Sequence, residues 1–193
     1  MKKPMTIALV KSMCAFALCL SIVSCGDNKK QEDPADVAED HNDAKFEQSK
    51  EKDAQFMVDA ATINQEEIQL GQLAQSKATA ADVKELANMM VTEHTKALEE
   101  LKGLAAKKGV TLPASLSTDK MDDYNKMMEK SNNDFDKAYS QKMVDGHKDA
   151  IKKFEDVAND QDRDAEVRDW ANKMLPSLRT HLDHSMMCAD KYK

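Results

Sequence analysis

The sequence predicts an all-helical protein, a four-helix bundle built from two similar helical hairpins. Glycine and proline are scarce, with five and four copies among 193 residues, and strand-like alternation of apolar and polar residues is absent. Apolar residues recur instead at three- and four-residue spacing over long stretches. There is also an internal repeat: "LAQSKATAADVKELANMM" from Leu73 matches "VANDQDRDAEVRDWANKM" from Val157 without a gap. Two such hairpins can bury their apolar stripes against each other.

The internal repeat has a second interpretation. Amphipathic helices resemble one another through composition alone, so part of the match needs no common origin. Because the match also includes the turn between two helices, we favour duplication of a helical hairpin.

The apolar spacing predicts four long helices and one short one. The second long helix stops at Gly109, a typical residue just after a helix C-terminus, and Pro176 is expected to bend the fourth. "VTLPASLS" is expected to be a loop and "TDKMDDYNKMMEK" a short connecting helix. Together they form a long crossover between the second and third long helices. The long helices are expected over residues 48–76, 80–108, 132–159 and 163–190.

The first 47 residues are predicted to lie outside the folded domain. An apolar run preceded by lysines is too short to span a bilayer but typical of a secretory signal. It ends in "IVSC", which resembles the bacterial lipobox. We therefore expect a lipoprotein signal peptide over residues 1–24 and lipidation of Cys25, with an ordinary signal peptide cut near Ser24 as the alternative. Residues 25–47 are polar and are expected to form a disordered tether, followed by the folded domain over residues 48–193.

The composition restricts the partners. Removing residues 1–24 takes away three lysines, which moves the formal net charge from −7 to −10. An acidic body argues against binding of nucleic acid, so the expected membrane contact is the N-terminal lipid. Once Cys25 carries lipid, Cys188 is the only thiol left, so no intrachain disulfide can form. The sequence indicates neither a protein partner nor an oligomeric state.

Each predicted long helix interrupts its apolar stripe with one ionisable residue. "MVTEHTKALEELKGLA" from Met90 and "MVDGHKDAIKKFEDVA" from Met143 carry their histidines at the same point. At about 1.5 Å of rise per residue, the long crossover places all four residues within about 10 Å in height near the middle of the bundle. Three imidazoles and one carboxylate would suit one zinc, copper or iron ion. The four residues are Glu67, His94, His147 and His181.

A polar network without metal is the competing hypothesis. Buried polar groups must find partners whether or not a metal is present, and Tyr139 or Asp136 could supply them. Glu93, Asp145 and Glu155 are candidates for acids that would support a metal site. The sequence leaves both hypotheses open.

The C-terminal stretch "HLDHSMMC" is a second candidate site. It places His181, His184 and Cys188 on one helical face by steps of three and four. Sulfur and imidazole ligands together suit copper. Fraying of the last helical turn and the use of methionine as adaptable core filling argue for a structural role instead.

Four segments resemble a known family. They are similar, in order and spacing, to the signature segments of a bacterial family named as domain of unknown function 4142, and the resemblance covers residues 55–185. It implies a ferritin-like bundle and an envelope location, but no activity. Ferritin-like di-iron proteins carry Glu three residues before each metal-binding histidine, whereas Val91, Val144 and Leu178 stand there in this chain, so no ferroxidase is expected. The segments are "EIQLGQLAQSKA", "MVTEHTKALEELKGLAAKKGVTLP", "FDKAYSQKMVDGHKDAIKKFE" and "LPSLRTHL".

These observations predict a lipid-anchored cell-envelope protein, placed in the outer membrane and facing the periplasm. Its bundle is expected to serve binding or stress protection without catalysis, because no Gly-rich phosphate loop or nucleophile motif is present. The alternative is a metal-binding or redox protein that uses the four ionisable residues. Gly26, rather than the aspartate associated with inner-membrane retention, follows Cys25.

Overall fold

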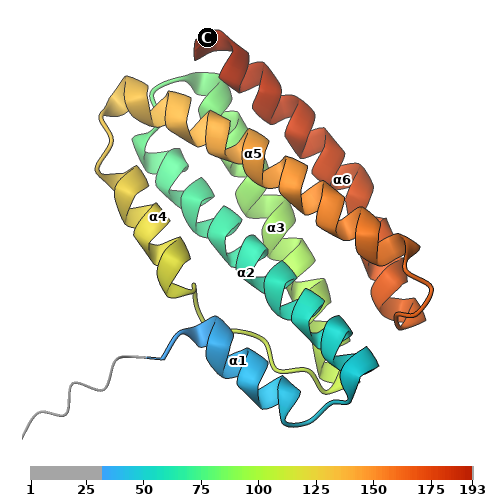
Figure 1. The fold of residues 1–193 in the computed structure, drawn as a ribbon. Coiled ribbons are helices and arrows are strands. Elements are labelled where there is room, and N and C mark those ends of the chain that lie inside the picture. Colours follow the sequence, from blue (N-terminus) through green and yellow to red (C-terminus); the bar gives the residue numbers. More distant parts are fainter. Residues whose placement is uncertain (1–31, 193) are drawn as a thin grey trace, which may run out of the picture. The chain divides into compact units, whose positions relative to one another are not determined.

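The computed structural model describes residues 32–192, and all regular structure in this range is helical (Figure 1). The all-helical prediction is therefore confirmed. None of the described helices is long and apolar enough to cross a membrane. The expected signal peptide and Cys25 lie outside the described residues. The helices are α1 (Pro34–Asp43), α2 (Gln48–Lys77), α3 (Ala81–Lys108), α4 (Thr118–Met128), α5 (Asn132–Asn159) and α6 (Ala165–Ala189), followed by the 3-10 turn η1 (Asp190–Tyr192).

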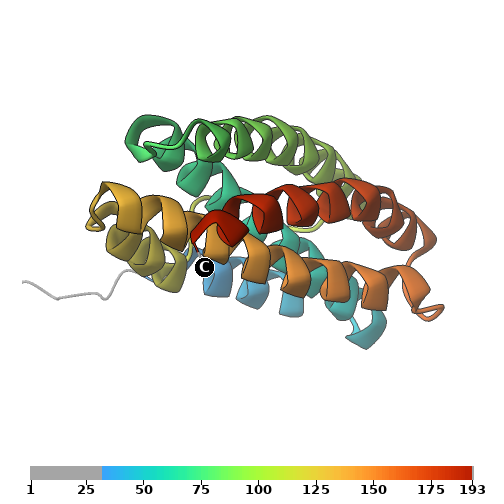
Figure 2. The same cartoon turned by 90° about the horizontal axis from the view of Figure 1, so that it is seen from above.

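The four long helices pack side by side as a helical bundle, in which α2 pairs with α3 and α5 pairs with α6. Viewed from above in Figure 2, α6 lies beside both α3 and α5. Ala80, just before α3, donates its amide to Asp136 near the start of α5 at 2.9 Å. Lys108, the last residue of α3, pairs with Asp164 just before α6 at 2.7 Å. Because α3 and α5 begin at the same end, they run in the same direction, and α4 lies on the return path between them (Figure 1).

Local sequence signals set the ends of the long helices. Gly109 follows α3 with φ 70°, and its amide closes the last turn onto the carbonyls of the preceding residues. At the start of α6, the Asp164 carboxylate accepts hydrogen bonds from the amides of Glu166 and Val167. The helix continues through Pro176 to Ala189.

Helix α1 differs from the disordered tether expected over residues 25–47. Asp33 caps the helix and also accepts a hydrogen bond from the Thr118 amide at 2.6 Å. The Asn42 side chain donates to the carbonyl of Thr111 and accepts from its amide, both at 2.9 Å. Polar contacts to the loop after α3 and to the start of α4, with the buried Ala38, hold this segment. Disorder was expected because this segment has no apolar stripe. Hydrogen bonds to distant residues hold it in a helix instead.

The core consists of two apolar clusters, one toward each end of the bundle. One cluster contains Phe154 and the other contains Tyr139, and they are named the Phe154 cluster and the Tyr139 cluster. Each is formed by residues of α2, α3, α5 and α6. In α5, His147 stands between Met143 of the Tyr139 cluster and Ala150 of the Phe154 cluster. The same order holds for His94 in α3. The histidines therefore occupy the level between the two clusters.

Candidate metal centre

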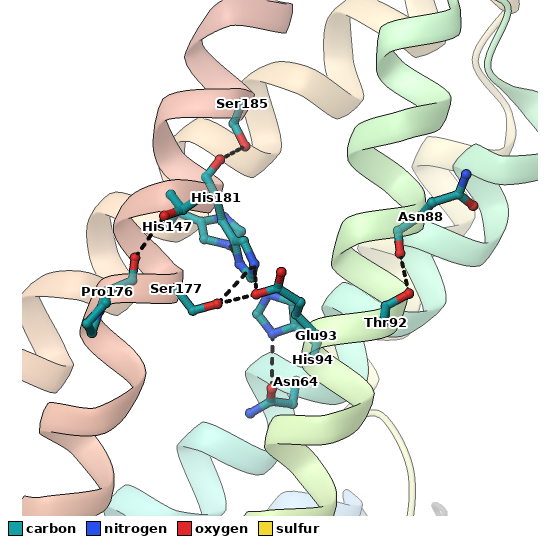
Figure 3. Close-up of polar contacts among 11 residues, drawn as sticks. Asn64, Asn88, Thr92, Glu93, His94, His147, Pro176, Ser177, His181 and Ser185 are labelled. Atoms are coloured by element: carbon teal, nitrogen blue, oxygen red, sulfur yellow. Dashed lines mark hydrogen bonds and ion pairs between the residues drawn. The ribbon is translucent and has the colours of Figure 1, made fainter.

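Three buried histidines from three different helices meet at this middle level. His94 lies on α3, His147 on α5 and His181 on α6, and each is at most 3% exposed. One ring nitrogen of each lies within 4.8 Å of a ring nitrogen of the other two. His147 Nε2 and His181 Nδ1 are 3.2 Å apart. Figure 3 shows the three rings together and their polar neighbours. The structure thus brings together three of the four residues proposed from the sequence.

The outward nitrogens of His94 and His147 face hydrogen-bond acceptors. His94 Nδ1 lies 3.0 Å from Asn64 Oδ1, and the Asn64 amide nitrogen donates to the Ala60 carbonyl at 2.7 Å, which fixes the side chain's orientation. His147 Nδ1 lies 2.8 Å from the Met143 carbonyl. Neither acceptor can donate, so both Nδ1 atoms carry the proton.

His181 is oriented by a carboxylate. Its Nε2 donates to Glu93 Oε2 at 2.9 Å, and the Ser177 hydroxyl donates to the same oxygen. Partial burial acts to raise the pKa of Glu93, but the hydrogen bonds from Ser177 and His181 leave it below its usual value. Glu93 is therefore a carboxylate at neutral pH. The proton of neutral His181 must then sit on Nε2.

All three rings are neutral near pH 7. Burial lowers the pKa of His147 to about 4 and places that of His94 well below its usual value. Burial also lowers the pKa of His181, although Glu93 opposes this shift. A neutral imidazole has one N–H, and each ring uses it on its outward partner. The inward nitrogens, His94 Nε2, His147 Nε2 and His181 Nδ1, are therefore unprotonated.

This proton count leaves a metal-free hydrogen-bond network incomplete. The two unprotonated nitrogens of His147 and His181 face each other at 3.2 Å with no proton between them. The buried His94 Nε2 has no hydrogen-bond partner within residues 32–192. A cation would satisfy all three lone pairs, and two nitrogens on a tetrahedral zinc ion stand about 3.3 Å apart. The three imidazoles and the 3.2 Å spacing of His147 and His181 fit one transition metal ion, with outward acceptors that orient each ring as in known metal sites.

Glu67 is not among the side chains grouped with the three histidines in the described chain. It is 5% exposed and borders surface cavities lined by residues of α4 and α5. Burial, followed by the charge of Glu66, raises the pKa of Glu67 to about 8. Asn64, one turn earlier on α2, contacts His94 in its place. Glu67 is therefore a protonated acid outside the histidine cluster at neutral pH.

The proposed patch at the end of α6 does not form a compact ligand group in the described residues. His184 is exposed, whereas Cys188 is buried and its thiol donates to the Asp82 carbonyl at 3.7 Å. Burial, followed by the charge of Asp82, raises the pKa of Cys188 to about 11. The thiol is therefore protonated at neutral pH, which disfavours it as a metal ligand.

Two residues that orient the rings did not emerge from the sequence. Asn64 lies four residues after Ala60 in the apolar stripe of α2, and Ser177 lies one helical turn before His181. Both are polar residues next to an apolar stripe, which is a signal that the sequence contains. Neither is ionisable, and only ionisable residues within the stripes were taken as candidates. Glu93, one of three acids considered as support, does contact the cluster.

The fold and the cluster define a class of protein: a helical bundle with a buried tris-imidazole centre at mid-height. The model of the family described as Domain of unknown function (DUF4142) matches residues 38–187, so the chain belongs to this family. The resemblance seen in the sequence is confirmed. No curated protein and no solved structure gives a match.

Proposed function

We propose that this protein binds one divalent transition metal ion through His94, His147 and His181. One observation carries the proposal: three neutral rings, each oriented by an outward acceptor, turn unprotonated nitrogens toward one another. This geometry favours the metal-binding alternative over a purely structural network. It is compatible with a binding module that performs no catalysis.

Zinc is the ion that this donor set fits best. Three protein ligands with a fourth position open to water or another molecule are typical of zinc sites that exchange ligands. Imidazole also suits copper, which generally binds such sites more tightly, so supply decides occupancy as much as affinity. The carboxylate-rich set of di-iron proteins is not part of this proposal.

The setting proposed for this site is a ferritin-like four-helix bundle with a long crossover, tethered to the outer membrane and facing the periplasm. The shared direction of α3 and α5 and the family membership support the bundle class. The signal-like residues 1–24 and the lipobox-like segment before Cys25 support the anchor.

The metal proposal is tested by metal analysis of the untagged protein after dialysis against zinc. Wild type should retain about one equivalent, and the double variant His94→Ala/His147→Ala should retain none. His184→Ala is the matched control, because this exposed histidine lies on α6 outside the cluster. Equal zinc content in the wild type and the double variant would refute the site.

The anchor is tested separately by fractionation and palmitate labelling. Cys25→Ala should release the protein from the membrane fraction and abolish labelling. Cys19→Ala, a substitution inside the proposed signal peptide, is the control and should change neither. Labelled, membrane-bound Cys25→Ala protein would refute lipidation at this residue.

A further inference from the structure

A cavity of about 470 Å³ lies beside the histidine cluster. This volume is within the range of small-molecule sites. At one side the cavity is bordered by His94 and His181, together with Glu93 and Ser177. Its other walls combine polar and charged residues with an apolar group that consists of Ile63, Ala97, Phe154, Trp170, Met174 and Leu178. A metal ion on the three histidines would therefore stand next to a partly open, amphipathic cavity.

Two buried polar atoms in the cavity lining lack a hydrogen-bond partner within the described part of the chain. One is His94 Nε2, which the metal would satisfy. The other is Trp170 Nε1, an obligatory donor on a side chain that is only 8% exposed. Buried donors of this kind normally find an acceptor. Both atoms are shielded from solvent, so an occupant could reach the Trp170 donor only after a movement of the indole ring.

The charge of the site selects an anionic occupant. Three neutral imidazoles leave the full charge of a divalent ion uncompensated at its open coordination position, and Glu93 is engaged with His181 and Ser177. Lys96, Lys173 and Glu100 also line the cavity, and Lys173 is paired with Glu100 at 2.7 Å. A carboxylate at the open coordination position would offset one of the two positive charges of the metal ion.

We infer that this cavity binds a small monocarboxylate with an aromatic or branched apolar body. The carboxylate takes the open position on the metal, and the body packs against Phe154 and Trp170. The inference rests on the proposed metal site. It adds the chemical class of the ligand that this site would recognise.

The test uses 3-phenylpropionate as the probe and the full chain as the protein. Trp170 is the only tryptophan in the sequence, so its emission reports directly on the cavity. Titrations compare zinc-loaded with metal-free protein, and zinc content is measured separately with a chromophoric chelator. Acetate and 3-phenylpropanol serve as probes that lack the apolar body or the carboxylate. Ala97→Phe fills the cavity without removing a histidine.

We expect 3-phenylpropionate to bind at least about tenfold more tightly to the zinc-loaded protein than to the metal-free protein. Both control probes should bind more weakly, and Ala97→Phe should keep zinc but lose the probe. Zinc binding without zinc-dependent probe binding would overturn this inference and leave the proposed function intact. Failure to bind zinc at all would overturn both.

Discussion

Two buried polar regions of the bundle, the histidine cluster and the Glu66–Glu67 pair, differ in how their polar atoms are satisfied. The histidines are neutral and turn unprotonated nitrogens toward one another. In the acidic pair, Glu66 forms ion pairs with Lys120 at 3.1 Å and with Lys142 at 2.8 Å. Glu67 has no ion pair among the described residues, and its pKa is raised to about 8. Glu67 Oε2 and His94 Nε2 both lack a hydrogen-bond partner among the described residues. The carboxyl group can take up a proton, whereas the inward imidazole nitrogens keep lone pairs that a metal could use.

This difference shows why a buried ionisable residue alone does not define a site. Glu67 can become neutral by taking up a proton, which removes the cost of burying its charge. The histidine rings are already neutral, yet their protons are all committed to outward partners. A ligand site is therefore recognised by which ring nitrogens carry the protons and where the unprotonated nitrogens point. Burial alone does not distinguish it from a tolerated polar residue.

The largest effect is expected at Glu67. Its pKa is near 8 in the folded protein and 4.5 in the unfolded chain, so folding retains a proton between these values. Stability should therefore fall as the pH rises from about 4.5 to about 8, by on the order of 5 kcal/mol at most. In urea titrations, Glu67→Gln should lack this loss, and the exposed Glu99→Gln should retain it. Identical pH profiles for wild type and Glu67→Gln would contradict the account.

Zinc should stabilise the protein through the histidine cluster alone. At a free zinc concentration of about 100 times the dissociation constant, the gain is about 2.7 kcal/mol. For a domain of this size, the melting temperature should rise by roughly 5–10 °C. Scanning calorimetry should show this shift for wild type and Glu67→Gln but not for His94→Ala/His147→Ala. Loss of the shift in Glu67→Gln would show that zinc binding also depends on Glu67. The two regions would then not be independent.

Asn64 should affect zinc affinity without contacting the metal. Asn64→Ala removes the acceptor that holds the His94 proton on Nδ1, so the dissociation constant for zinc should rise by about 10–100-fold. Asn64→Asp keeps an acceptor oxygen for His94 but loses the donation to the Ala60 carbonyl, so its affinity should fall less than that of Asn64→Ala. Competition with a chromophoric chelator measures both. Unchanged affinity in Asn64→Ala would show that His94 does not depend on this orientation.

Glu93 should give the smallest effect of the series. Glu93→Gln keeps an oxygen that can accept from His181 Nε2, and the side chain is 44% exposed. The affinity of the Glu93→Gln variant for zinc should fall by about tenfold or less. The same chelator assay measures it. A loss larger than that of Asn64→Ala would mean that the negative charge, rather than the acceptor, holds His181.

Periodicity predicted the long helices closely because their stability comes from burying one apolar stripe. The second long helix was expected over residues 80–108 and is found at Ala81–Lys108, ending at Gly109. Helix α1 escaped prediction because it depends on hydrogen bonds from Asn42 to Thr111, 69 positions further along the chain. No local pattern records such a contact.

The sequence predicted the height of the site residues along the bundle, but not the direction in which each side chain points. Counting residues placed Glu67 and the three histidines at one level, and three of the four do meet there. Three residues along an α-helix turn the side chain by about 300°, so Asn64 and Glu67 face directions about 60° apart. That angle decides which of them contacts His94. Only the packing of α2 against its neighbours fixes it.

The most direct test of the metal site is ¹⁵N NMR of the histidine rings before and after zinc is added. In the metal-free protein, the spectrum should place the ring protons on Nδ1 of His94 and His147 and on Nε2 of His181. One equivalent of zinc should then shift His94 Nε2, His147 Nε2 and His181 Nδ1. Protons on those inward nitrogens, or zinc that leaves their signals unmoved, would contradict the account.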